Sequence, residues 1–226
     1  DFGVTARWLD ERRLAVPGGQ HYRPCSYRVE GDYSQAAFPA VLGAVCGGVA
    51  VTGLRPDSLQ GDAAILDILA RCGANFTRTG DEVRFQAAPL RATAIGLAAC
   101  PDLGPILMVL GLFCEGDMVI TNAGRLRIKE SDRIAAMQEE LAKFGGQVLA
   151  KGETVTVKGL GGALRAPTQP LNTHNDHRVA MALSVAAWAA GLPALLEDAG
   201  AVAKSWPTFF EDMARGLGTR WQVREE

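Results

Sequence analysis

The sequence predicts an α/β domain built from three repeated units, preceded by a short piece of another domain. Three segments are apolar around nearly the whole helical wheel, as is typical of helices that are covered on all sides. Each is followed by a short apolar strand and then by an amphipathic helix ending in a glycine; these glycines, Gly73, Gly145 and Gly218, lie 72 and 73 residues apart. This period is too long for the common solenoid repeats. We therefore expect a closed domain with buried helices inside and sheets outside, while a two-layer α/β domain with accidental periodicity is the alternative.

The elements follow one order in each unit. The buried helices are expected at 33–48, 103–114 and 178–191. The strands that follow them are expected at 49–54, 117–123 and 193–199. The amphipathic helices are expected at 62–73, 132–145 and 207–218. Paired strands are expected at 75–79 with 82–86 and at 147–151 with 154–158, and a single strand at 219–223. An aspartate precedes or opens each buried helix, at Asp32, Asp102 and Asp176, where it can act as a cap.

The repeat divides the chain into two parts. Residues 1–27 lie outside it and are expected to be the tail of a preceding domain and an interdomain crossover, whereas 28–226 form the repeat domain. The chain begins without Met, and its first residues read as the middle of a patterned segment. We therefore expect an N-terminal portion to be missing.

Composition excludes several classes of function. The chain has 226 residues, 48% of them hydrophobic, and a formal net charge of −2, so there is no global electrostatic case for a nucleic acid or an anionic membrane as partner. No segment approaches the roughly 18 apolar residues of a membrane span. The five cysteines are scattered and odd in number, which argues against a disulfide framework and favours a reducing, cytosolic compartment.

Cations occur where helices are expected to start. Arg133 lies in the first turn of the helix at 132–145, His177 and Arg178 in the first turn of the third buried helix, and Lys204 before a start marked by Ser205 and Pro207. The exposed N–H groups and the dipole of a helix start repel a cation, so the pattern indicates a bound anion. Cations and helix N-termini together form sites for phosphate or carboxylate groups. No Walker-type loop is present, because the glycines at 159–162 do not open a helix.

Residues 125–133 extend this pattern. Period-two alternation in residues 125–129 predicts a strand with Arg125, Arg127 and Lys129 on one face. Ser131 or Asp132 can cap the helix that follows. A solvated charged face is the alternative for this stretch.

Two carboxylates and a histidine are candidates for proton transfer. Asp102, at the opening of the second buried helix, can act as a base or only as a helix cap. Glu130 lies between Lys129 and Arg133, so acting as an acid would require a bound anion that raises its proton affinity. For His177 a neutral, structural role and a proton-transfer role both remain open.

These motifs resemble a known family. The segments LRIKESDR, NDHRVAMA and AKSWPTFF, with EGDYSQAAF and SLQGD earlier, resemble the C-terminal half of the EPSP synthase (3-phosphoshikimate 1-carboxyvinyltransferase) family. The resemblance implies an α/β domain of three βαβαββ units around a pseudo-threefold axis, with buried parallel helices inside and sheets outside. It also implies that Arg133, Arg178 and Lys204 hold phosphoenolpyruvate. Asp102 would take the proton of the shikimate 5-hydroxyl, and Glu130 would protonate the enol methylene. Lys129 would contact the shikimate 3-phosphate beside Glu130. Arg125 departs from the Asn of some members and is left out.

The implied reaction transfers the enolpyruvyl group from phosphoenolpyruvate to shikimate 3-phosphate with release of phosphate, in the shikimate pathway to aromatic amino acids. No metal or organic cofactor is implied, and the family is the target of glyphosate, which competes with phosphoenolpyruvate. The expected partners are the two substrates and the absent N-terminal half, without which the chain should be inactive because catalysis needs both walls of a closing cleft. A UDP-N-acetylglucosamine enolpyruvyl transferase and a non-catalytic partner-binding domain are the alternatives.

Overall fold

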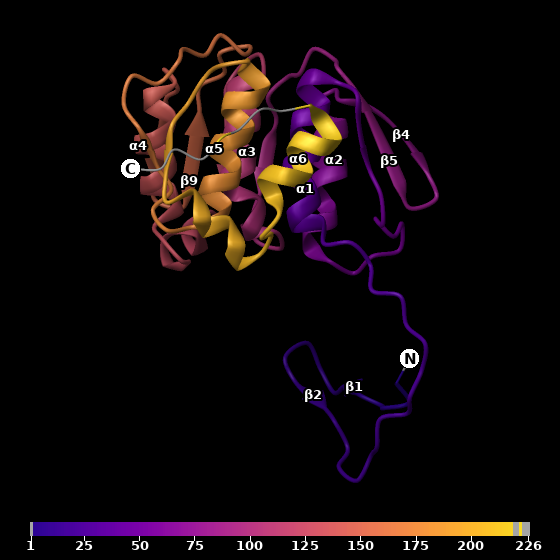
Figure 1. Ribbon diagram of the computed structural model, residues 1–226. Coiled ribbons are helices and arrows are strands. Elements are labelled where there is room, and N and C mark those ends of the chain that lie inside the picture. Colours follow the sequence, from indigo (N-terminus) through magenta and orange to yellow (C-terminus); the bar gives the residue numbers. More distant parts are fainter. Residues whose placement is uncertain (1, 219–221, 223–226) are drawn as a thin grey trace. The chain divides into compact units, whose positions relative to one another are not determined.

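A computed structural model describes residues 2–218 and Gln222 (Figure 1). The chain separates into two compact units, Asp1–Glu30 and Gly31–Glu226. The first unit contains a short antiparallel hairpin of β1 (Arg7–Trp8) and β2 (Leu14–Ala15). The domain boundary expected after residue 27 stays a prediction.

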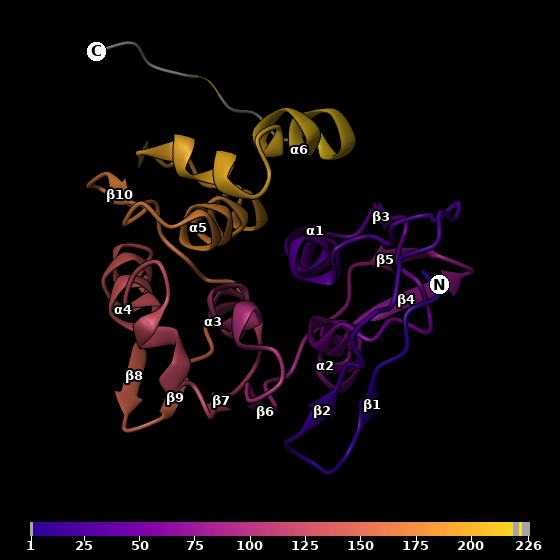
Figure 2. The ribbon, with the colours of Figure 1, turned by 90° about the horizontal axis from the view of Figure 1, so that it is seen from below.

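The second unit is built around three buried helices, α1 (Tyr33–Cys46), α3 (Gly104–Phe113) and α5 (His177–Ala190). Every residue of α3 is buried, as the apolar wheel predicts. Helices α1 and α5 run in the same direction: Ser34 bonds Arg178 where they start, and the Cys46 Sγ lies 3.7 Å from the Ala189 carbonyl oxygen where they end. Figure 2 shows the three helices side by side at the centre, with strands and other helices outside them. The predicted arrangement of buried helices is confirmed.

The strands among the described residues of this unit form three sheets. The first has the order β3-β5-β4 and is antiparallel, with β3 (Val49–Val51), β4 (Asn75–Thr79) and β5 (Glu82–Gln86). The second has the order β6-β7-β9-β8. Strand β6 (Ala94–Gly96) is parallel to β7 (Met118–Thr121). Strand β9 (Thr154–Val157) is antiparallel to both of its neighbours, β7 and β8 (Val148–Lys151). The third pairs β10 (Leu171–Asn172) with β11 (Leu196–Glu197) in parallel.

Two buried helices approach their sheets through a glycine. Gly43 of α1 lies over Val49 and Phe85, which are cross-strand partners in β3 and β5. A Cβ atom at Gly43 would be 2.7 Å from the Val49 Cβ and 2.8 Å from the Phe85 Cβ. Gly111 of α3 lies in the same way over a cross-strand pair of β7 and β9, where a Cβ would be 2.9 Å from the nearest side-chain atom. The first two repeats therefore share this packing contact as well as their order of elements.

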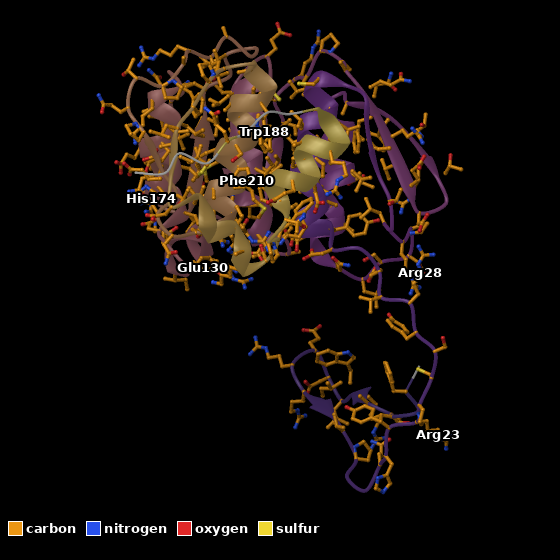
Figure 3. The ribbon with its side chains drawn as sticks, in the orientation of Figure 1. Arg23, Arg28, Glu130, His174, Trp188 and Phe210 are labelled. Carbon is orange, nitrogen blue, oxygen red and sulfur yellow. The ribbon has the colours of Figure 1, made fainter. Side chains whose placement is uncertain are left out.

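Three amphipathic helices complete the units. They are α2 (Ala64–Arg71), which follows the 3₁₀ turn η1 (Gly61–Ala63), α4 (Arg133–Lys143) and α6 (Phe209–Leu217). Gly73, Gly145 and Gly218 follow them with φ angles of 87°, 88° and 65°, the left-handed conformation expected of glycines that end helices. Helix α6 packs on α5 through aromatic rings, with the centroids of Trp188 and Phe210 6.1 Å apart (Figure 3).

The predicted strand at 125–129 is wrong. These residues belong to the 3₁₀ helix η3 (Gly124–Ile128) and its C-terminal cap, Lys129. Leu126 is fully buried while Ile128 is 82% exposed, so the two do not share a face. The reason is tertiary packing: Leu126 packs inward against Gly104 at the start of α3 while Ile128 stays exposed, and a strand would place both on one face.

Other helix boundaries in the structure also differ from the predicted ones. Asp102 lies in the 3₁₀ turn η2 (Pro101–Leu103) and does not cap α3. Lys204 ends the 3₁₀ helix η4 (Ala199–Lys204), and α6 begins only at Phe209, because Trp206 and Thr208 bond the Asp212 carboxylate and shape the turn between them. The strand predicted at 219–223 lies outside the described residues except for Gln222.

Within the described residues, none of the helices is both long enough and apolar enough to traverse a lipid bilayer.

Candidate functional site

The predicted site residues come from separate elements and meet in one cluster. Asp102 comes from η2, Lys129 and Glu130 from the loop after η3, Arg133 from the first position of α4, Arg178 from the second position of α5, and Lys204 from the end of η4. Each is within 3.4 Å of another member of the cluster. Figure 3 shows Glu130 near the lower end of the second unit in that view.

Arg133 is the centre of this cluster. Only 1% of its side chain is exposed, and three carboxylates surround its guanidinium. Asp176 accepts hydrogen bonds from Nε at 2.8 Å and from Nη2 at 3.2 Å, Glu130 from Nη2 at 2.6 Å, and Asp102 from Nη1 at 3.1 Å. The two bonds to Asp176, which is fully buried, fix the plane of the guanidinium, as bidentate Arg–carboxylate pairs do.

Asp102 connects three of the cations. Its Oδ1 lies 3.0 Å from the Lys129 Nζ and 3.1 Å from the Arg133 Nη1, and its Oδ2 lies 3.4 Å from the Arg178 Nη2. Burial acts to raise the pKa of Asp102, but Arg178, Lys129 and Arg133 together outweigh it and hold the pKa below its ordinary value. Asp102 is therefore a carboxylate anion at neutral pH.

Glu130 bridges Arg133 and the fourth cation, Lys204. Its Oε2 accepts from the Arg133 Nη2, and its Oε1 accepts from the Lys204 Nζ at 2.8 Å. Partial burial would raise the pKa of Glu130, but the hydrogen bond from Lys204, a backbone hydrogen bond and the charge of Arg133 lower it to about 2. In this arrangement Glu130 holds no proton that it could donate near neutral pH.

The carboxylates of the cluster balance most of the positive charge that the sequence placed at the helix starts. Four cations (Lys129, Arg133, Arg178, Lys204) face three carboxylates (Asp102, Glu130, Asp176), which leaves a formal excess of one positive charge. Asp176 and Asp132 cap α5 and α4, so the helix starts are also partly satisfied by the chain itself. The site retains a net attraction for anions, but an incoming anion must compete with Asp102 and Glu130.

Two further titratable groups border the cluster. His177, with 6% of its side chain exposed, has a buried Nδ1 that finds no hydrogen-bond partner among the described residues, and burial followed by the charge of Arg178 lowers its pKa. Its imidazole is therefore neutral at physiological pH. Burial followed by the charge of Asp102 raises the pKa of Asp62, whose buried Oδ1 likewise has no partner in the part of the chain that the structure describes.

The structure brings all six predicted site residues together, whereas their roles as ligands and catalysts stay predictions. Sequence reasoning missed two members of the site. Asp176 was predicted only as a cap, and Ser34, which bonds Arg178 at 2.9 Å, was assigned no role. The motifs EGDYSQAAF and NDHRVAMA contain both residues and were the available signal.

A group of possible metal ligands lies elsewhere. Among the described residues, ligand atoms of Glu139, Glu140 and His174 lie within 4.8 Å of one another. The buried Glu140 carboxylate already receives the Lys143 ammonium at 2.8 Å on both oxygens, so a cation occupies this position without any metal. We assign no metal to the group.

Comparisons with known proteins agree with the geometry. The family model for EPSP synthase (3-phosphoshikimate 1-carboxyvinyltransferase) matches residues 1–213. The 3-phosphoshikimate 1-carboxyvinyltransferase of Clostridioides difficile is 37% identical over 225 residues, 99% of this chain and 51% of the relative. That of Methanothrix thermoacetophila is 43% identical over 200 residues, 88% of this chain and 46% of the relative.

Solved structures give the same fold. EPSP synthase from Acinetobacter baumannii superposes with a TM-score of 0.84 at 25% identity, over 95% of this chain and 52% of that chain. The enolpyruvyl transferase NikO from Streptomyces tendae, at a TM-score of 0.70 and 19% identity, shares the fold. The predicted fold class is thereby confirmed. The chain spans about half the length of the curated relatives it matches, and it belongs to the EPSP synthase family.

Proposed function

We propose that this chain provides one wall of the active site of a 3-phosphoshikimate 1-carboxyvinyltransferase. The enzyme transfers the enolpyruvyl group of phosphoenolpyruvate to the 5-hydroxyl of shikimate 3-phosphate and releases phosphate. The observation that carries this proposal is the convergence of four cations and two partly exposed carboxylates in one cluster, with Arg133 and Arg178 at the starts of α4 and α5. Family membership supports it, and the cysteine pattern supports a cytosolic location.

The cations bind and orient the substrates. Arg133, Arg178 and Lys204 hold the phosphate and carboxylate of phosphoenolpyruvate, and Lys129 contacts the phosphate of shikimate 3-phosphate. Arginine suits these anions because its planar donors match two oxygens at once. Since Arg133 is fixed by Asp176, only Asp102 and Glu130 need to be displaced from its other donors.

The carboxylates move the protons. Asp102 takes the proton of the 5-hydroxyl as the hydroxyl oxygen bonds to C2 of phosphoenolpyruvate, and Glu130 gives a proton to C3, which forms a tetrahedral intermediate. A proton then leaves the new methyl group while the bond from C2 to the phosphate oxygen breaks, which restores the double bond and releases inorganic phosphate. Glu130 becomes a proton donor because an anion bound to Arg133 and Lys204 removes the charges that lower its pKa.

The partner is the remainder of the enzyme. The curated relatives are about twice as long as this chain, and the first unit exposes large apolar side chains, including Trp8, Tyr22 and Val29. We therefore expect the chain alone to release no phosphate. Sedimentation with and without the rest of the enzyme would show whether the two parts associate.

Phosphate release tests the reaction. The full chain is mixed with the part of the Clostridioides difficile relative outside the match, and phosphate is measured with phosphoenolpyruvate and shikimate 3-phosphate. Glu130→Gln should abolish release, while Glu139→Gln, which changes an exposed glutamate of α4 outside the cluster, should leave it unchanged. Release with UDP-N-acetylglucosamine instead, or by the chain alone, would contradict the proposal.

Ligand binding tests the site without the other half. Titration calorimetry of phosphoenolpyruvate into the full chain should give weaker binding for Lys204→Ala, which changes a side chain that is 55% exposed. Lys151→Ala, an exposed lysine of β8, is the control. Equal binding by the two variants would remove Lys204 from the site.

A further inference from the structure

We propose that Ser34 is a positioning residue for Arg178: it orients the guanidinium toward the bound anion without neutralising its charge. The inference rests on the proposed function, in which Arg178 contacts phosphoenolpyruvate. Ser34 belongs to the first repeat and Arg178 to the third, 144 residues later, so the contact joins the two ends of the second unit.

The geometry ties both terminal nitrogens of Arg178 to one residue. The Ser34 Oγ accepts a hydrogen bond from Nη2 at 2.9 Å, and the Ser34 carbonyl oxygen accepts from Nη1 at 3.5 Å. Ser34 is 4% exposed and Arg178 8%, so water does not compete freely for these bonds. Among the described residues, the guanidinium also pairs with Asp102, whose Oδ2 lies 3.4 Å from Nη2 and whose side chain is 29% exposed. Ser34 is therefore the partner that stays in place when a substrate reaches Asp102.

A hydroxyl suits this position better than a carboxylate. Arg133 is held by Asp176, which fixes its plane but also cancels its charge. Ser34 is a neutral acceptor, so Arg178 keeps a full positive charge to offer to an anion while losing freedom of rotation. Fixing a binding group in advance lowers the entropy that is lost when the ligand arrives.

Ser34 is itself held in place by its neighbours. Its backbone N–H donates to the Asp32 carboxylate at 2.8 Å, the N-cap bond of α1. The Tyr33 N–H donates to the Gln60 Oε1, and the Gln60 Nε2 donates to the Gly31 carbonyl oxygen, each at 2.9 Å. The loop that carries the SLQGD motif thus fixes the start of the helix that carries Ser34. The motifs EGDYSQAAF and SLQGD thus both serve the orientation of one arginine, a role that the sequence did not indicate.

A pair of serine variants tests the proposal. Ser34→Ala removes the neutral acceptor, and Ser184→Ala makes the same change at a serine that is 3% exposed and whose Oγ bonds the Ala180 carbonyl oxygen within α5. Titration calorimetry of phosphoenolpyruvate into the full chain should show weakening of about 10- to 100-fold for Ser34→Ala, the size expected for one hydrogen bond to a charged group, and little change for Ser184→Ala. Equal weakening in both variants would overturn the proposal.

The guanidinium itself provides a second readout that needs no substrate. Carbon-detected NMR of arginine side chains resolves the Nη1 and Nη2 signals of a guanidinium that rotates slowly, and Arg178→Lys assigns them by their loss. In Ser34→Ala the Nη1 and Nη2 signals of Arg178 should exchange faster or merge, while the Arg133 signals stay separate. In Ser34→Thr, which retains the hydroxyl, the two Arg178 signals should again be separate. Unchanged Arg178 signals in Ser34→Ala would overturn the proposal. A wild-type chain that binds no phosphoenolpyruvate would count against the proposed function instead, and the NMR comparison would still decide the role of Ser34.

Discussion

Arg133 is a buried cation whose charge is balanced by buried and partly buried carboxylates. Replacing it by alanine leaves Asp176, which has no exposed side-chain surface, without its cation. Breaking a buried pair in this way costs about 3–5 kcal/mol of unfolding free energy. Urea unfolding of Arg133→Ala at neutral pH should show a loss of this size.

Arg127 offers the matched control for that variant. It pairs with Asp132 at 3.0 Å, but both side chains are about two-fifths exposed, at 40% and 39%. Arg127→Ala should therefore cost no more than about 1 kcal/mol. Similar losses for Arg127→Ala and Arg133→Ala would show that burial of the Arg133 pairs is not what stabilises the domain.

Glu130 links stability to pH. Its pKa is lowered from 4.5 to about 2 in the folded chain, so the stabilisation from its pairs is fully present above about pH 5 and is lost as the pH falls through the folded pKa. Because 27% of the side chain is exposed, solvent screening reduces this contribution to about 1 kcal/mol. Wild type and Glu130→Gln should differ by about this amount at pH 6, and the difference should shrink steadily in urea unfolding at pH 4 and pH 3. A constant difference across this range would contradict the pairing.

At this scale the sequence predicted which residues meet but not how they pair. The rule that helix starts repel cations identified Arg133, Arg178 and Lys204. It could not show that Arg133 would meet Asp102 and Asp176, which are 31 and 43 residues away, because pairing over such separations depends on how the repeats close.

Glycines on the buried helices set how closely each helix lies on its sheet. Gly43→Ala would place a Cβ 2.7 Å from the Val49 Cβ, a contact that the rigid β3 and β5 pair cannot relieve cheaply. Such overpacking costs about 1–3 kcal/mol. Urea unfolding should show this loss.

Gly216 provides the opposite case. It lies in α6, where a Cβ would meet no atom of the described residues within 4 Å, so Gly216→Ala should stabilise the domain by about 0.5–1 kcal/mol through helix propensity. A destabilised Gly216→Ala, or a neutral Gly43→Ala, would show that the packing distances do not govern these positions.

Elements with a long periodic pattern were predicted well, and short ones were not. The three buried helices and the glycines that end the outer helices match because their patterns repeat over many residues. Residues 125–129 failed because their alternation is short, and the burial of Leu126 against Gly104 decided their conformation instead.

The buried core of the whole molecule belongs to the second unit. Among the described residues, its members run from Tyr33 to Met213. A variant that lacks residues 1–28 should therefore keep the melting temperature of the full chain within about 2 °C, as expected for a change below 1 kcal/mol in a domain of this size. Extending the deletion through residue 36 removes the Asp32 cap and Ser34 and should lower the melting temperature markedly. Equal melting temperatures for the two deletions would show that the start of α1 does not contribute.

The threefold repeat was predictable at this scale, because the glycine spacing and the order of the helices recur along the chain. The third repeat is the exception. Its sheet contains only the two short parallel strands β10 and β11 among the described residues, a departure that no pattern in residues 193–199 indicated.

The hydrogen bond between Ser34 and Arg178 spans 144 residues, so we expect it to form late in folding. Closing so long a loop is entropically costly, and contacts of this range slow the search for the native state. During refolding the guanidinium of Arg178 should become immobile only in the slowest phase, after the local hairpins and outer helices have formed. Immobilisation of the Arg178 guanidinium would thus report the folding step in which the first and third repeats come together.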